Sequence, residues 1–296
     1  MCLTPLTHLF KRHRNDILQN AFLRMRPKSL DRFLQNSTHL ASRNVSLVVA
    51  YQQPWTLAWL ARMAKRHLTD STLLVFDNSR SPQSRVDIER VCRDHEIPYL
   101  PLPPNLETHP NRSHGSAMTW IYHNVVRAIE PEIFSFIDHD LIPMEPIAFS
   151  ETLGDQPFYG LPRFYGLPRF DKWGWSLWAG YCVYKFSAVS HLPLNFLQDV
   201  PRLLDTGGRN WTVLYHQHDR YQLRFAETRD IAIADPLDGT RHPVQVIDGN
   251  WIHLNGASYS SSFREMLPFY ERIATAADER TTLGMLDRNL KQQISD

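Results

Sequence analysis

Two aspartates one residue apart, Asp138 and Asp140, are the residues of this chain whose types and spacing most directly suggest chemistry. They follow the apolar run 133–137, which is typical of a buried strand, and Pro143 would stop its continuation. Strand alternation would point both carboxylates to one side of the sheet edge. Hard divalent ions bind one or two such carboxylates together with phosphate oxygens. The triplet therefore indicates a metal–diphosphate site, although the same residues could simply begin a polar loop.

The segments around this triplet alternate between strand and helix. Short apolar runs predict strands, and most are followed by a segment with helical spacing. The expected strands cover 46–50, 72–76, 99–102 and 133–138, and the expected helices begin at Pro54, Pro82 and Ser113. Repeated β-α-β units predict an α/β fold with a doubly wound, mostly parallel (mixed) sheet and helices on both faces. Such sheets bind ligands at the carboxyl ends of their strands, where the triplet lies.

Composition places the chain among ordinary globular proteins. Of its 296 residues, 43% are apolar and 21% are charged, which excludes wholesale disorder. No apolar run approaches the ~18–20 residues of a transmembrane helix. The three cysteines, Cys2, Cys92 and Cys182, are scattered and odd in number, which favours a reducing, cytoplasmic compartment without a disulfide framework.

Positive charge is concentrated near the start of the chain. Residues 1–44 hold eight Lys or Arg against two Asp, a local net charge of +6 in a chain whose total is +1. Apolar residues with helical spacing run through this segment, namely Ile17, Leu18, Phe22, Met25, Leu30, Phe33 and Leu34. Two interpretations stay open: a basic amphipathic helix on the inner face of an anionic membrane, or a peripheral helix packed on the domain with its basic face in water. The mildly acidic remainder argues against nucleic-acid binding.

No composition shift divides residues 45–259, so we expect one catalytic domain there. A basic helical extension, 1–44, would precede it, and a helical extension, 260–296, would follow it. The hexapeptide Tyr-Gly-Leu-Pro-Arg-Phe occurs twice in succession, at 159–164 and 165–170. Two copies are too few for a solenoid and are typical of a tandem duplication in a loop.

Four segments occur in an informative order along residues 46–259. They are the opening strand and helix 46–66, then Asp77-Asn78-Ser79 at a strand end, then His114-Gly115-Ser116 at a loop-to-helix junction, and then Asp138-His139-Asp140. Their order and spacing resemble the GT-A-fold glycosyltransferases, most of all the family-2 nucleotide-sugar-dependent group. Each segment alone is weakly specific. Together they imply a GT-A-like sheet that binds a nucleotide-diphosphate sugar.

The resemblance implies a donor site that uses Mn²⁺ or Mg²⁺. Asp77 would accept a hydrogen bond from the base, with a UDP-sugar favoured, and His114 and Gly115 would lie beside the ribose. Asp140 would ligate the metal directly, and Asp138 would bind the ribose hydroxyls or the metal through water. The metal would stabilise the leaving diphosphate as a Lewis acid. Plain turn chemistry at Asp77 stays open as an alternative, as does plain helix capping at the residue before His114.

A late segment, 251–259, resembles the part of the family that often adds a histidine to the metal shell. His253 is the candidate ligand, although the chain has 14 histidines and a lone histidine is more often structural. The following loop, 256–258, contains a glycine that could let the backbone approach the phosphates.

An inverting transfer needs a base that deprotonates the acceptor hydroxyl. The resemblance implies an acidic residue near the start of a helix that follows the metal triplet. Asp205, which precedes the expected helix 209–216, is the first candidate, and Asp219 is the second. The chain departs here from the usual Glu-Asp pair of the family, and plain helix capping by Asp205 stays open.

Aromatic residues are concentrated between the triplet and Asp205. They are Phe158, Tyr159, Phe164, Tyr165, Phe170, Trp173, Trp175 and Trp178. Aromatic faces suit the apolar C–H faces of sugars. We expect Trp173 and Trp175 to bind the acceptor, as in a similar Gly–Trp loop of the family, and Trp178 to lie in the core of a strand over 177–186.

The sequence therefore predicts a metal-dependent glycosyltransferase of hexosyltransferase type, acting on a glycan or lipid-linked acceptor in surface polysaccharide synthesis. A haloacid-dehalogenase-type phosphatase, with Asp138 as nucleophile, is one alternative. Leu141 and the two β-α units before the triplet disfavour it. The other alternative is a catalytically silent GT-A-like protein that binds a nucleotide or glycan. Intact Asp140, Asp205 and His253 argue against that alternative.

Overall fold

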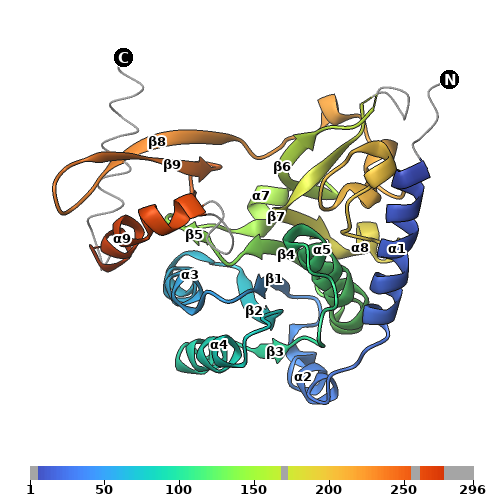
Figure 1. Cartoon of the computed structure of the whole chain (residues 1–296), viewed down its shortest axis with the longest axis horizontal. Helices are drawn as coiled ribbons and strands as arrows, with labels where there is room; N and C mark the ends of the chain where they lie inside the picture. Colours follow the sequence, from blue (N-terminus) through green and yellow to red (C-terminus); the bar gives the residue numbers. More distant parts are fainter. Residues whose placement is uncertain (1–5, 168–172, 255–260, 277–296) are drawn as a thin grey trace.

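The strands of the computed structural model form two sheets within its described residues, 6–167, 173–254 and 261–276 (Figure 1). The larger sheet has six strands in the order β3-β2-β1-β4-β7-β6. These strands are β1 (Asn44–Ala50), β2 (Ser71–Asp77), β3 (Tyr99–Pro101), β4 (Ile133–Asp138), β6 (Phe158–Phe164) and β7 (Trp175–Lys185). The first four strands in the sheet order run parallel, and β7 and β6 are antiparallel to their neighbours. The expected mixed, mostly parallel sheet is confirmed.

A second, antiparallel sheet in the order β5-β10-β9-β8 was not predicted from the sequence. Its strands are β5 (Leu141–Pro143), β8 (Thr228–Ala234), β9 (Arg241–Ile247) and β10 (Trp251–His253). β5 follows β4 after a turn at residues 139–140, so Pro143 ends a new strand instead of stopping β4. The alternation of side chains expected for a strand therefore ends at Asp138. Asp140 lies in the turn that joins the two sheets and not in β4.

Helices cover both faces of the six-stranded sheet, as predicted. α3 (Pro54–His67) and α4 (Pro82–Asp94) pack on one face, where they meet Val48 of β1. α2 (Leu30–Asn36) and α5 (Pro110–Ile121) pack on the other face, which receives Leu47 and Val49. Alternate residues of one buried strand thus enter two different cores, which explains why the parallel strands carry apolar residues on both faces.

The remaining elements are short except for those at the two ends of the described chain. They are α1 (Leu6–Leu23), η1 (Thr38–Leu40), η2 (Tyr122–Val126), α6 (Arg127–Ile129), α7 (Phe149–Leu153), α8 (Phe186–Val189), η3 (Val200–Arg202), η4 (Gly208–Trp211), η5 (Tyr215–Gln217), η6 (Arg220–Gln222) and α9 (Ser261–Ala276). η4 and η5 are 3₁₀ turns, so the single helix expected over 209–216 was wrong. None of the described helices is long and apolar enough to cross a membrane.

α5 begins three residues before the expected start at Ser113, because Pro110 occupies its first turn. η2 is a π-helical turn that continues into α6. His114 and Gly115 therefore lie inside the helix and not in a loop before it.

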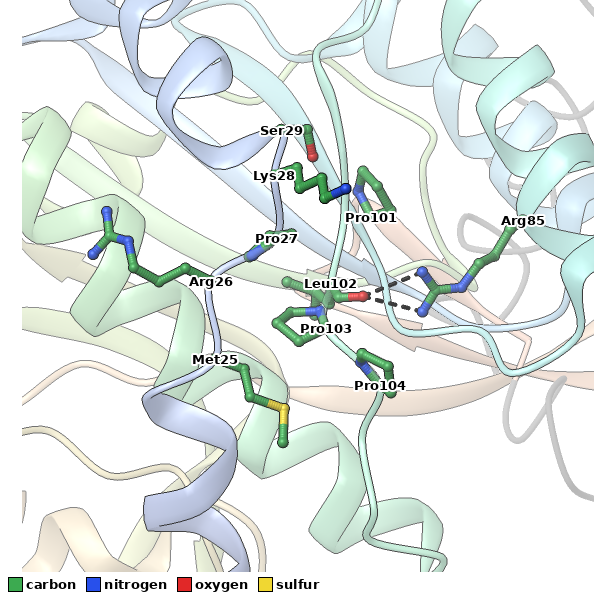
Figure 2. A pocket seen from close by; sticks show the side chains of 10 residues that line it. All are labelled: Met25, Arg26, Pro27, Lys28, Ser29, Arg85, Pro101, Leu102, Pro103 and Pro104. Atoms are coloured by element: carbon green, nitrogen blue, oxygen red, sulfur yellow. Dashed lines mark hydrogen bonds between the residues drawn. The ribbon is translucent and has the colours of Figure 1, made fainter.

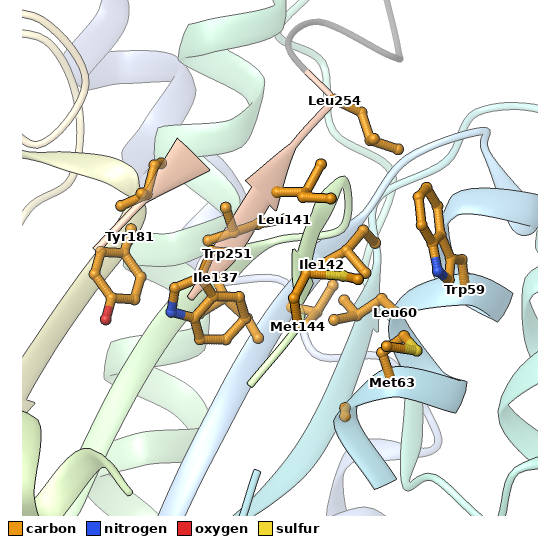
Figure 3. Packing of buried hydrophobic residues seen from close by; sticks show 14 of the residues in the cluster. Trp59, Leu60, Met63, Ile137, Leu141, Ile142, Met144, Tyr181, Trp251 and Leu254 are labelled. Atoms are coloured by element: carbon orange, nitrogen blue, oxygen red, sulfur yellow. The ribbon is translucent and has the colours of Figure 1, made fainter. Parts of the chain in front are cut away.

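Apolar side chains anchor the turn at residues 139–140 from both sides (Figure 3). Ile137 precedes the turn and Leu141 follows it, and both are buried in the same core as Trp251 of β10 and Leu60 of α3. Because the interior is close-packed, these contacts leave the turn little freedom to move. The core therefore fixes the position of the acidic triplet.

Candidate metal centre

Three potential metal ligands converge where the two sheets meet. Oxygens of Asp138 and Asp140 and a ring nitrogen of His253 all lie within 4.8 Å of one another. Asp138 is the last residue of β4, and His253 is brought to it by the pairing of β10 with β5, in which His253 lies opposite Leu141. The backbone N–H of Leu254 donates to the Asp140 carbonyl at 3.0 Å, which ties the two segments together.

The hydrogen bonds of His253 leave its other nitrogen directed at the carboxylates. Nδ1 lies 2.6 Å from Oε1 of Gln245, and because an amide oxygen can only accept, Nδ1 is the donor. In the neutral ring Nε2 then carries a lone pair, and it lies 3.9 Å from Asp140 Oδ1. A ring nitrogen held in this way is typical of a metal-ligating histidine.

His114 of α5 adds another nitrogen to the same place. Its Nε2 is buried, lies 3.5 Å from Asp138 Oδ1 and has no hydrogen-bond partner among the described residues. Burial lowers the pKa of His114 to about 4, although the negative charge of Asp140 and the Ala179 backbone oppose that shift. His114 is therefore neutral at pH 7 and does not neutralise Asp138.

Two carboxylates therefore lie close together at this site. Burial, and then the charge of Asp140, raise the pKa of Asp138 to about 6, while His253 and His139 act in the opposite direction. The two carboxylates and a ring nitrogen of His253 lie close enough together to share one ion, and His114 Nε2 lies beside Asp138. A divalent ion binds its ligands at about 2.0–2.1 Å, so its ligand atoms lie roughly 3–4 Å apart. The donor set and its spacing fit Mn²⁺ or Mg²⁺.

An irregularity in β7 shapes the wall of this site. Leu161 of β6 is the single residue opposite the four residues 178–181 of β7, so β7 bulges there. A Cβ at Gly180 would collide with Asp138 Oδ2 and with the ring of Trp178, so only glycine leaves room for the carboxylate. Bulges beside functional sites commonly redirect side chains in this way.

Trp178 lies in β7 and packs against the core, as predicted, but it also forms part of this wall. Its ring is partly exposed and lies 4.7 Å from the ring of His253, centroid to centroid. The guanidinium of Arg163 lies over the indole, 5.7 Å from its centroid. The sequence signal was the glycine two residues later, because a glycine inside a strand often marks a bulge or a close approach.

Sequence reasoning also missed two supporting side chains that come from the second sheet and from α9. Gln245 of β9 orients His253, as described above. Tyr270 of α9 is buried, and burial together with the charge of Asp140 raises the pKa of Tyr270 to about 12. Their positions depend on long-range packing, so no local pattern could have identified them.

Asp77 lies at the same sheet edge as Asp138, two strands away and roughly 10 Å distant. Its carboxylate is fully buried and accepts hydrogen bonds from the backbone N–H of Ser79 at 2.8 Å and from the Tyr99 hydroxyl at 2.9 Å. Asn78 donates to the Ser113 hydroxyl at 3.0 Å, which joins this corner to α5. These contacts give Asp77 a role in holding the segment 77–79 in place. Its contact with the base of a nucleotide stays a prediction.

Gly115 and Asp205 lie near the centre but outside its ligand set. A Cβ at Gly115 would collide with the carbonyl of Phe196, so the glycine allows α5 to pack closely against the 196–206 segment. The Thr206 side chain borders the same position, which places Asp205 one residue away from this contact. Asp205 is partly exposed, and its Oδ1 accepts a hydrogen bond from Gln198 at 3.0 Å.

The structure does not bring Asp219 to the centre. Asp219 is exposed and caps η6 through the Tyr221 N–H at 3.1 Å. Its neighbour His218 packs on Phe158, which pairs with Tyr184 at the level where β4 begins, away from Asp138.

The two candidate acceptor tryptophans have different surroundings. Trp173 is exposed, with a backbone φ of 66°. Trp175 is buried, and its ring stacks on Tyr215 at 4.8 Å and meets Trp211 edge-on at 6.1 Å. In this conformation Trp173 is accessible to a bound acceptor, whereas Trp175 is not. The predicted phosphate loop, 256–258, lies outside the described residues, as does part of the second hexapeptide copy.

A cavity of about 620 Å³ lies beyond the outer strand β3, apart from the acidic centre (Figure 2). Its lining residues are Met25, Arg26, Pro27, Lys28, Ser29, Arg85, Pro101, Leu102, Pro103 and Pro104. The Arg85 guanidinium donates to the Leu102 carbonyl at 3.1 and 3.2 Å and to the Ser79 carbonyl at 2.7 Å. Arg85 therefore links the cavity wall at Leu102 to the segment 77–79, which contains Asp77.

No protein-family model matches the chain, and no curated protein matches it. The structure has low similarity to solved structures, including the following two. One is TarS from S. aureus, with a TM-score of 0.26 and 16% identity over 35% of this chain. Another is the mannosyltransferase PcManGT from Pyrobaculum calidifontis in complex with GDP-Man and Mn²⁺, with a TM-score of 0.33 and 12% identity over 62% of this chain. The chain spans 18% and 57% of the lengths of these two proteins.

Proposed function

We propose that the chain is a metal-dependent glycosyltransferase that moves a sugar from a nucleotide-diphosphate sugar to a glycan or lipid-linked acceptor. The observation that supports this proposal is the convergence of Asp138, Asp140 and His253 at the carboxyl edge of the sheet. The two carboxylates and the Nε2 of the neutral His253 ring can each donate an electron pair to a cation. A cation at such an edge is well placed to meet a diphosphate.

In this proposal each residue has a distinct task. Asp140 and His253 would hold Mn²⁺ or Mg²⁺, and Asp138 would hold the metal or the ribose. The metal would supply Lewis-acid stabilisation of the departing diphosphate. Asp77 and Asn78 would shape the pocket for the base, with a UDP-sugar favoured. Surface polysaccharide synthesis in the cytoplasm is the setting that we propose for the reaction.

Nucleotide binding is tested by thermal shift with a panel of UDP- and GDP-sugars, each with and without Mn²⁺. A diphosphate ligand at about 100 times its dissociation constant should stabilise the protein by about 2.7 kcal/mol, and only when Mn²⁺ is present. Absence of any metal-dependent stabilisation across the panel contradicts the donor site. Release of phosphate from a simple phosphate ester, without nucleotide binding, would instead favour the phosphatase.

The general base is tested by comparing Asp205→Asn with Asp219→Asn. We propose Asp205 as the base, so Asp205→Asn should retain Mn²⁺-dependent donor binding but lose transfer by about 10²–10⁴-fold. Asp219→Asn should transfer normally, because Asp219 is exposed and caps η6. UDP release with each donor and acceptor measures the rate. Normal transfer by Asp205→Asn would move the base to another residue.

A further inference from the structure

The helix α1 is attached to the rest of the protein by its polar side. Asn15, Gln19 and Phe22 are buried, and their spacing of four and three residues puts them on one helix face. Gln19 donates to Thr119 of α5 at 3.1 Å and exchanges hydrogen bonds with Asn195 at 3.1 and 2.7 Å. The inner face of α1 is therefore held largely by hydrogen bonds.

The opposite face of α1 is apolar and exposed. Leu6, Phe10 and Ile17 are 83%, 71% and 57% exposed, and their spacing places them on one face, half a turn away from Asn15. Figure 1 shows α1 along the right-hand edge of the molecule. An ordinary peripheral helix buries its apolar stripe and exposes its polar one. α1 does the reverse, which a partner for the outer face would explain.

The charges of α1 indicate what kind of partner this face fits. Lys11, Arg12 and Arg14 are exposed, whereas the single acidic residue of the helix, Asp16, is paired with Arg209. Arg14 also reaches Glu107 at 3.4 Å on the domain side. Lys11 and Arg12 lie more than a quarter turn around the helix from Leu6, Phe10 and Ile17. A helix with one exposed apolar face and cations on its other faces matches the boundary between lipid headgroups and acyl chains.

We propose that the outer face of α1, formed by Leu6, Phe10 and Ile17, docks on an anionic lipid surface. The apolar side chains enter the acyl boundary while the cations meet lipid phosphates. A second copy of the chain fits this face less well, because a symmetric contact would bring two positively charged helices together. One face of an 18-residue helix is also small beside the ~800 Å² per partner of a stable dimer. This inference does not depend on the proposed transferase function.

The test is co-sedimentation of the full chain with vesicles of phosphatidylcholine alone or with about 30 mol% phosphatidylglycerol. The protein should bind the anionic vesicles, bind the neutral ones far less, and dissociate at high salt. Phe10→Ser with Ile17→Ser should lower the partition coefficient about tenfold or more. Val86→Ser on α4 is the matched control, because Val86 is also 57% exposed, and it should bind normally.

Three results would overturn the proposal. They are failure of the wild-type chain to bind anionic vesicles, an equal loss of binding in Val86→Ser, and a dimer in solution that only the double substitution dissociates. The double variant should keep the melting temperature and any Mn²⁺-dependent shift of the wild type, since neither residue touches the metal centre. The vesicle result is therefore independent of the donor-site result.

Discussion

Asp140→Asn should abolish stabilisation by Mn²⁺ and lower transfer by about 10³-fold or more, because the proposed site would lose one direct ligand and its charge. Saturating Mn²⁺ at about 100 times its dissociation constant should stabilise the wild type by about 2.7 kcal/mol, or roughly 4 °C in a chain of this size. The substitution keeps the shape of the side chain, and the backbone bond from Leu254 to the Asp140 carbonyl is unaffected. The fold should therefore remain intact.

The matched control for this substitution is Asp87→Asn. Asp87 lies on α4 and pairs with Arg90 at 2.6 Å, away from the metal centre. Asp87→Asn removes the same charge by the same chemical change as Asp140→Asn. Because Asp87 lies away from the metal centre, its substitution should leave both the Mn²⁺-dependent stabilisation and the transfer rate unaltered. If Asp140→Asn retains the full Mn²⁺ shift, Asp140 is not a ligand.

The parallel half of the main sheet was predictable because each of its strands is determined locally. The largely apolar runs 46–50, 72–76 and 133–138 were expected to be strands, and β1, β2 and β4 end at Ala50, Asp77 and Asp138. The start of α4 was also predictable, because Ser81 accepts from the Ser84 N–H and Pro82 occupies the first turn. Such signals act within a few residues and need no knowledge of the tertiary structure.

The second sheet was not predictable in this way. β5 and β10 are three residues each, too short for periodicity, and they exist because they pair with each other and bury their own Ile142 and Trp251 in the core. This sheet is nevertheless what brings His253 to Asp140. The sequence could suggest His253 by resemblance, but its geometry depends on pairing between segments more than 100 residues apart.

Sequence reasoning located the acidic centre but not its surroundings. Asp138 and Asp140 were identifiable because charge at the end of a buried strand is costly and therefore informative. Trp178, Gly180 and Gln245 were missed because their roles arise from a bulge and from a neighbouring strand. Conversely, Trp175 was assigned to the acceptor by type, and the structure surrounds it with Tyr215, Trp211 and Phe158.

Asp138→Asn should make the metal-free protein more stable at pH 8 while removing transfer. Burial and the charge of Asp140 raise the pKa of Asp138 to about 6, so the ionised carboxylate is unfavourable in the folded state. A raised pKa of this size corresponds to an effect on the order of 1–3 kcal/mol, or a rise of roughly 2–5 °C in melting temperature. Removing a strained charge from a functional site is a common route to higher stability at the expense of activity.

The pH dependence distinguishes this electrostatic cause from improved packing. Asp138 is ionised in both the folded and the unfolded chain above pH 6, so its cost is then fully present. The cost declines as pH falls from about 6 towards the unfolded value of about 4, because the folded state takes up the proton first, and below that it is absent. The stabilisation by Asp138→Asn, measured by thermal melts with EDTA, should follow the same course and vanish near pH 4. An equal gain at pH 4 and pH 8 would show that charge is not its source. A bound cation also relieves the repulsion between Asp138 and Asp140. Adding Mn²⁺ at pH 8 should therefore reduce or reverse the difference in melting temperature by which Asp138→Asn exceeds the wild type.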